Sequence, residues 1–100
     1  MDIKETLQSV LAGYAGEALN GYSYLTSSSD QTVFTVVSVG SIEGQHIVDT
    51  GLVVRLVDNQ IIIERNVNDK PLVDALLEAG VPRTQIHLVY AGESFSTAVF

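Results

Sequence analysis

The sequence predicts an α+β domain in which two amphipathic helices cover one face of a mostly antiparallel sheet of four to five strands. Apolar residues recur at helical spacing in two segments, one near each end of the chain. β-branched segments of strand length lie between these helical segments and after the second one. With 100 residues, of which 46% are hydrophobic, we expect residues 1–100 to form a single domain around one core.

The first helix is predicted at the start of the chain. Its apolar residues follow helical spacing at Ile3, Leu7, Val10, Leu11 and Tyr14. Gly13 and Gly16 weaken its continuation, so we expect the helix to end between Gly13 and Asn20. The dipeptide Asn20-Gly21 then predicts a turn.

The first two strands are predicted from β-branched segments. Residues 22–26 follow the turn and form a short strand. In residues 32–39, apolar side chains such as Phe34 and Val37 occupy both faces, which is typical of a central strand. Glycines at both ends of residues 40–44 predict the next turn.

A tight hairpin is predicted in the middle of the chain. Residues 47–57 and 61–66 form its strands, and Asp58-Asn59 forms its two-residue turn. The register that this turn imposes places on one face the residues Leu52, Val54, Leu56, Ile61 and Ile63.

The second helix is predicted over residues 70–79. Asn68-Asp69 supplies a cap, Pro71 suits the first turn, and Gly80 ends the helix. Residues 85–90 alternate in polarity and form the final strand. A strand, a helix and a strand in succession imply a right-handed crossover, so this strand should run parallel to its neighbour in the sheet.

Charge and composition exclude several classes of function. Twelve acidic and five basic residues give a net charge of −7. The basic residues form no cluster, so we expect no direct binding to DNA or RNA. The longest apolar runs are far below the ~18 residues of a membrane span, and the start of the chain lacks the pattern of a signal peptide. We therefore expect a cytoplasmic protein that does not insert into membranes.

The sequence offers little support for a cofactor or a metal ion. The chain contains no cysteine, which rules out disulfides and thiolate metal sites. His46 and His87 are far apart and have no ligand-pair spacing. We therefore expect no metal and no cofactor.

One triplet resembles a catalytic motif. Asp49-Thr50-Gly51 is similar to the active loop of retroviral-type aspartic proteases, which are homodimers that share two aspartates at the dimer axis. Leu52 stands where that family has a small residue, and the partner motif of those proteases is not found. We favour the alternative that Asp49 lies at a bend or bulge where a strand begins, in a protein that is not an enzyme.

The order of parts in residues 52–93 is the most specific pattern in the chain. An apolar strand and a short polar turn lead to a second strand ending in Glu64-Arg65-Asn66, and a helix closing on residues 78–82 (EAGVP) precedes an isoleucine-containing strand. This order resembles the C-terminal part of the XisI-like family. The chain departs from that family in lacking tryptophan and in its shorter C-terminal segment.

The resemblance implies a function and a partner. Members of the XisI-like family are identified as fdxN element excision controlling factors, small cyanobacterial proteins associated with regulated removal of a DNA element. They are not the recombinase, and they are usually encoded beside XisH-like proteins. The resemblance therefore implies binding to an XisH-like protein, with no catalytic residues to carry over.

We predict that the interaction surface includes residues 52–66 of the hairpin and the C-terminal tail, residues 94–100. The hairpin carries apolar residues on both faces, and the tail is too short to bury its own aromatic side chains. A cross-strand ion pair is expected between Arg55 and Glu64. A homo-oligomer through the same surface is equally compatible with the pattern. The predicted interface residues are Arg55, Glu64, Arg65, Phe95 and Phe100.

Overall fold

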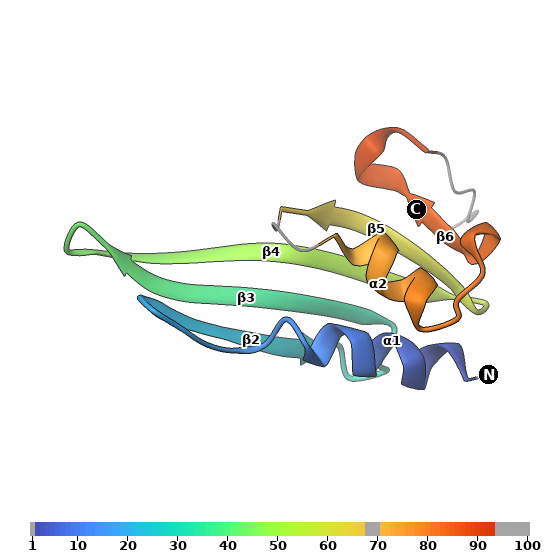
Figure 1. The fold of residues 1–100 in the computed structure, drawn as a ribbon, viewed down its shortest axis with the longest axis horizontal. Coiled ribbons are helices and arrows are strands. Elements are labelled where there is room, and N and C mark those ends of the chain that lie inside the picture. The colour runs from blue at the N-terminus through green and yellow to red at the C-terminus, as the bar shows by residue number, and fades with distance from the viewer. Residues whose placement is uncertain (1, 68–70, 94–100) are drawn as a thin grey trace.

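Two helices, α1 (Ile3–Ala12) and α2 (Leu72–Glu78), lie on one face of a single sheet (Figure 1). The structure is a computed structural model that describes residues 2–67 and 71–93. Within these ranges the sheet has six strands, more than the four to five expected, and the predicted α+β class is confirmed. Neither helix of the described chain is long and apolar enough to cross a membrane.

The strands follow one another across the sheet in sequence order. They are β1 (Gly16–Ala18), β2 (Gly21–Ser27), β3 (Val33–Ile42), β4 (Gln45–Val57), β5 (Gln60–Asn66) and β6 (Ile86–Leu88). Neighbouring strands run antiparallel from β1 to β5. β5 and β6 run parallel, which confirms the orientation predicted for the strand after the second helix.

The first helix ends earlier than predicted. Its last residue is Ala12, just before the expected interval of residues 13–20. Gly16 then adopts a φ of 133°, which favours glycine, and the chain turns into β1. The pairing of β1 with β2 was not predicted, because a three-residue strand is too short to show an alternating pattern.

The turn predicted at residues 40–44 is shorter than expected. Pairing of β3 with β4 continues out to Ile42 and Gln45. The chain reverses at Glu43 and Gly44, whose φ values are 51° and 79°. Two successive left-handed residues form a two-residue turn that matches the twist of a hairpin, so both strands run on past Gly40.

The hairpin between β4 and β5 has the predicted turn and, from Val57 back to Val54, the predicted register; beyond Val54 a bulge shifts the register by one residue. Asp58 and Asn59 have φ values of 50° and 61°, and Val57 pairs with Gln60. The face predicted to be apolar lies in the core, where four of its side chains are fully buried: Leu52, Val54, Ile61 and Ile63.

The second helix is confirmed over most of its predicted length. Pro71 is its N-cap in an extended conformation, and the helix ends one residue earlier than predicted. Gly80, with a φ of 97°, follows the helix as expected. The predicted cap at Asn68-Asp69 and the predicted first residue, Lys70, lie outside the described residues.

The final strand is shorter than predicted. Only the centre of residues 85–90 is extended, because one 3₁₀ turn, η1 (Arg83–Gln85), precedes β6 and another, η2 (Val89–Ala91), follows it. After β6 the Glu93 carboxylate accepts a hydrogen bond of 2.9 Å from the backbone N–H of Leu88. That bond closes the chain into the η2 turn, where a longer strand was expected.

The core lies between the two helices and the part of the sheet that they cover, on β3 to β6. Each helix contributes its apolar stripe, and the strands contribute the side chains that alternate onto the same face. The buried residues of the helices are Ile3, Leu7, Leu11, Leu72 and Leu76. Beneath them on the sheet lie Phe34, Val36, Leu52, Val54, Ile61 and Ile63. The helices therefore cover one face of the sheet, as predicted.

Candidate functional site

β3 and β4 extend beyond the rest of the sheet as a two-stranded arm. β2 pairs with β3 only as far as Gly40, and β5 pairs with β4 only as far as Leu52. We call residues 41–50 the distal arm. It projects away from the helices in Figure 1, and residues 41–49 are all exposed. Within the described part of the chain no second layer covers this arm, so its side chains are available to a binding partner.

Two β-bulges lie where the distal arm leaves the sheet. The β3–β4 register shifts beside Val36, which leaves Gly51 as the extra residue of β4. The β4–β5 register shifts beside Val53, which leaves Glu64 as the extra residue of β5. Bulges bend a strand and increase its twist, so this pair sets the direction in which the arm projects.

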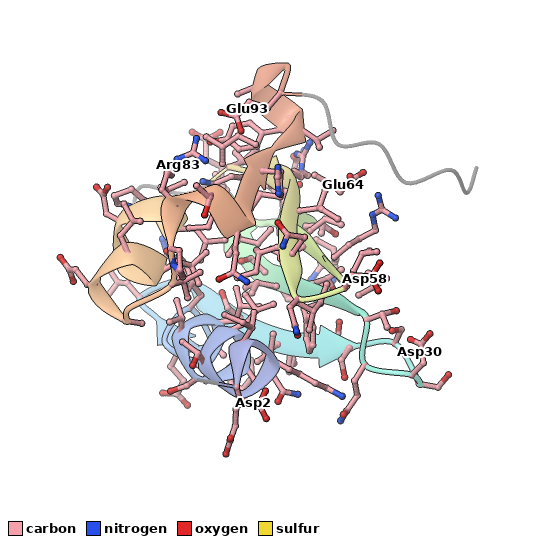
Figure 2. The ribbon with its side chains drawn as sticks, turned by 90° about the vertical axis from the view of Figure 1, so that its right-hand side faces the viewer. Asp2, Asp30, Asp58, Glu64, Arg83 and Glu93 are labelled. Carbon is pink, nitrogen blue, oxygen red and sulfur yellow. The ribbon has the colours of Figure 1, made fainter. Side chains whose placement is uncertain are left out.

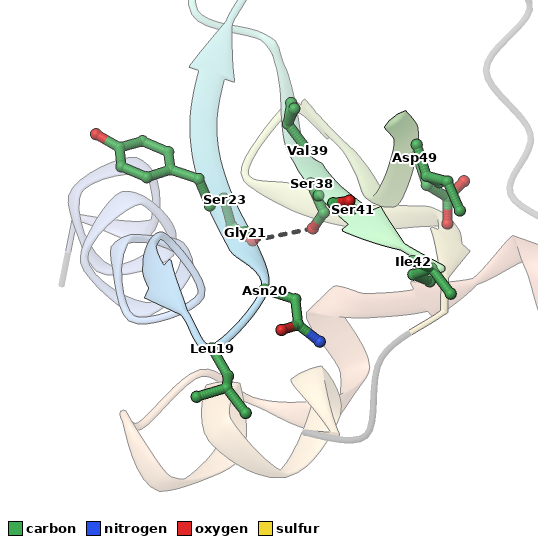
Figure 3. A pocket seen from close by; sticks show the side chains of 12 residues that line it. Leu19, Asn20, Gly21, Ser23, Ser38, Val39, Ser41, Ile42 and Asp49 are labelled. Carbon is green, nitrogen blue, oxygen red and sulfur yellow. Dashed lines mark hydrogen bonds between the residues drawn. The ribbon is translucent and has the colours of Figure 1, made fainter. Parts of the chain in front are cut away.

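A groove of about 470 Å³ lies at the base of the arm (Figure 3). Its walls come from the turn between β1 and β2, from the end of β3 and from the start of β4. The lining residues are Leu19, Asn20, Gly21, Tyr22, Ser23, Ser38, Val39, Gly40, Ser41, Ile42, Ile47 and Asp49. A groove of this volume accommodates a few side chains or a small molecule.

Two glycines and two serines form the floor of the groove. Gly21 pairs with Gly40, and a Cβ atom on Gly21 would lie 2.2 Å from the carbonyl oxygen of Val39. β2 and β3 approach each other this closely only because the side chain is absent. Beside them the Ser23 and Ser38 hydroxyls are joined by a hydrogen bond of 2.9 Å (Figure 3).

The rim of the groove is apolar. Leu19 is 98% exposed, Ile42 is 58% exposed and Ile47 is 37% exposed. These side chains surround a floor of hydroxyl and backbone groups, a combination that suits an apolar side chain of a partner flanked by hydrogen-bonding groups. The charged residues within the distal arm are Glu43 and Asp49, which make its surface acidic.

Arg65 holds the base of the arm. Its Nε donates a hydrogen bond of 2.6 Å to the carbonyl oxygen of Thr50, and its Nη2 lies 3.7 Å from Oδ1 of Asp49. Both side chains of this ion pair are about half exposed, so it contributes at most ~1 kcal/mol. Its role is to position the arm.

Asp49 lies within a regular antiparallel strand, opposite Ser38. The expectation that it marks a bend or bulge where a strand begins is wrong in detail, because β4 already starts at Gln45 and the bulge falls two residues later at Gly51. The extended strand at Asp49 also differs from the loop that carries the aspartate of a protease. Nothing in this geometry favours peptidase chemistry.

The two histidines lie apart in the structure. His46 is on the exposed distal arm, whereas His87 on β6 has its Nε2 2.8 Å from Oε1 of Gln60. No group of three potential metal ligands occurs among residues 2–67 and 71–93. The described part of the chain therefore gives no basis for assigning a metal site.

The structure brings together two of the predicted interface residues. Arg55 and Glu64 form the expected cross-strand pair, with 3.6 Å between Nε and Oε1, on the sheet face opposite the helices. Their side chains are partly buried rather than fully exposed. Arg65 is separate from this pair, since it joins the arm. Phe95 and Phe100 lie outside the described residues.

A second exposed ion pair closes the end of the described chain. Arg83 Nη2 lies 2.8 Å from Oε2 of Glu93, and Figure 2 shows the pair far from Asp30 and Asp58. The backbone N–H of Leu88 and the Arg83 guanidinium lower the pKa of Glu93 below its usual value. Hydrogen bonds from Ser28 and Thr32 likewise lower the pKa of Asp30.

Sequence reasoning missed the groove. The prediction of a turn at residues 40–44 removed Ile42 from the sheet and hid the pairing that forms the arm. The signal was present, because Glu43-Gly44 is a pair of turn-forming residues between two segments with alternating polarity. Leu19 showed no such signal, since its place on the rim depends on the unpredicted strand β1.

Comparison with known proteins supports the order of parts noted above. The family model of XisI protein matches residues 2–98. No curated protein matches the chain. The structure of a XisI-like protein from Anabaena variabilis ATCC 29413 is similar at a TM-score of 0.65 and 20% identity, covering 88% of this chain and 80% of that one. The fdxN element excision controlling factor XisI from the same organism is similar at a TM-score of 0.63 and 20% identity, covering 85% of this chain and 86% of that one. These two structures share the fold.

Proposed function

This chain belongs to the XisI family, and we propose that it is an element excision controlling factor that acts by binding an XisH-like protein, without chemistry of its own. The observation that carries the proposal is the distal arm with the groove at its base. Exposed apolar side chains at Leu19, Ile42 and Ile47 rim the groove, and the last two lie on the distal arm, where residues 41–49 are all exposed. Contiguous apolar surface of this kind marks binding sites.

The chemistry of the groove favours a protein over a nucleic acid. The groove is rimmed by apolar groups, and the carboxylates of Glu43 and Asp49 on the arm would repel phosphates. A partner with an apolar residue flanked by basic side chains fits both features. The family resemblance supplies the identity proposed for that partner, an XisH-like protein.

Titration calorimetry with an XisH-like protein tests the proposal. We expect Ile47→Asp to weaken binding by at least tenfold, because it places a charge on the apolar rim. Leu77→Asp is the matched control, since Leu77 on α2 is 41% exposed and Ile47 is 37% exposed. Binding should also weaken as salt rises, because the arm is acidic.

Three results would count against the proposal. If the wild-type chain and the XisH-like protein do not associate at micromolar concentrations, the proposed partner is wrong. If both variants bind like the wild type, the groove is not the site. If both variants lose binding equally, the loss does not come from the arm.

A further inference from the structure

Among residues 2–67 and 71–93, no helix lies over β2, β3 and β4 on the sheet face opposite α1 and α2. The register places side chains from all three strands on this face, with Val37 between Tyr24 on β2 and Thr50 on β4. We call this surface the open face. Its strands continue the alternation that puts Val36 and Leu52 into the core on the other side. Over β2 to β4, the helices of the described residues therefore cover only the other side of the sheet.

The open face is apolar, aromatic and nearly uncharged. Tyr22 and Tyr24 are 44% and 47% exposed, and their ring centroids are 4.7 Å apart. Around them lie β-branched residues, among them Val37, Val39 and Val48. This composition contrasts with the chain as a whole, which carries a net charge of −7.

The charged groups of the open face are confined to its margins. At one margin Arg55, near the end of β4, forms an ion pair with Glu64, and Arg65 lies opposite Val53. At the other margin Glu17 on the edge strand β1 pairs with Tyr22 and shares its side of the sheet. The centre, around Tyr24, Val37 and Thr50, therefore carries no charged side chain.

We propose that two copies of this chain associate through the open face, in an antiparallel sheet-on-sheet packing related by a two-fold axis. The distribution of charge favours a second copy of this chain as the partner on the open face. Two copies that each carry −7 repel one another wherever acidic surfaces meet, so they can approach closely only through a neutral face. A basic partner, by contrast, would find no opposite charge here. β-branched and aromatic side chains are also those that pack sheets face to face at about 10 Å.

The size of the open face predicts a weak dimer. Three strands about 4.8 Å apart, each about 23 Å long over seven residues, give a projected area of roughly 330 Å² per copy. A standard stable interface buries about 800 Å² per partner. We therefore expect an association that depends on concentration, with a dissociation constant in the micromolar range.

Sedimentation equilibrium over a range of protein and salt concentrations tests the dimer. We expect the mass to rise from the 10.8 kDa of the chain toward twice that value. Raising the salt concentration should strengthen association, because salt screens the repulsion between acidic copies. Salt should have the opposite effect on binding of a basic partner to the acidic arm, which it should weaken.

Matched variants locate the interface. Tyr24→Lys should weaken dimerisation by at least tenfold, because it puts like charges together at the two-fold interface. Leu77→Lys, on the helix side with a similar exposure of 41%, should leave dimerisation unchanged. The chain contains no cysteine, so Thr35→Cys gives one thiol on the open face for a short bismaleimide cross-linker, with Ser9→Cys on α1 as control. We expect cross-linked dimers from the Thr35 variant only.

A wild-type chain that stays monomeric at several hundred micromolar in high salt would overturn the proposal. So would a dimer that survives Tyr24→Lys and is cross-linked through Ser9→Cys. If the wild type is monomeric and Tyr24→Lys reduces binding of the XisH-like protein, the open face belongs to that partner and the dimer is wrong. The proposal does not depend on the excision role, because it is tested with this chain alone.

Discussion

The same two strands, β3 and β4, serve two regions with opposite properties. In the half of the sheet beneath the helices, Phe34 is 1% exposed and Leu52 is not exposed at all. In the distal arm, Ile42 is 58% exposed and Val48 is 59% exposed. The side-chain types are similar, so residue type alone does not distinguish stability from binding. The difference in exposure arises because the helices cover one part of these strands and do not cover the arm.

The two bulges mark the border between these regions. They fall at Gly51 and Glu64, between the last core residue pairs and the start of the arm. On the core side, burial stabilises the fold. On the arm side, Arg65 and the Glu43-Gly44 turn maintain the shape of an exposed ribbon. The fold thus keeps an exposed element that contributes little to the core.

The largest effect that separates the two regions is expected from truncating an apolar side chain in each. Phe34→Ala should lower the free energy of unfolding by about 3–5 kcal/mol, because it leaves a cavity beneath the helices. Ile42→Ala should change it by less than about 0.5 kcal/mol, because Ile42 is exposed. Urea unfolding followed by circular dichroism measures both. Equal losses would mean that the arm is part of the core.

An intermediate effect is expected at the junction of the two regions. Gly21→Ala should destabilise the fold by about 1–3 kcal/mol, because the new Cβ would meet the Val39 carbonyl oxygen at 2.2 Å. Gly40→Ala is the matched control, with a nearest atom at 3.0 Å and a smaller expected loss. Thermal unfolding of both variants ranks them. A neutral Gly21→Ala would show that the strands separate at the groove without cost.

The smallest effect is expected from the exposed ion pair at the end of the described chain. The pKa of Glu93 is lower in the folded chain than its usual value of 4.5. Its contribution to stability is therefore present above pH 4.5 and disappears as the pH falls through the folded pKa. Nuclear magnetic resonance of the Leu88 amide during an acid titration should report this change. The amide of Glu93→Gln should show no such titration.

The elements predicted well from sequence are those whose signal is local. The Asp58-Asn59 turn forces a two-residue hairpin, and its register then determines which side chains enter the core. Gly80 ends the second helix for an equally local reason. By contrast, the extent of β3 past Gly40 depends on a pairing that no short window shows. The same contrast holds for the candidate site: the Arg55–Glu64 pair, which follows from the hairpin, was predicted, whereas the groove, which depends on distant strand pairing, was not.

The sequence by itself determined the fold class, the helix-covered core, the hairpin register and the acidic character that disfavours nucleic acid. These follow from periodicity, turn chemistry and charge, which act over a few residues or over the whole composition. Only the tertiary structure decided where β2 and β5 stop pairing. That decision leaves one end of β3 and β4 uncovered, because exposure depends on neighbours distant in sequence. The arm and the groove result from it.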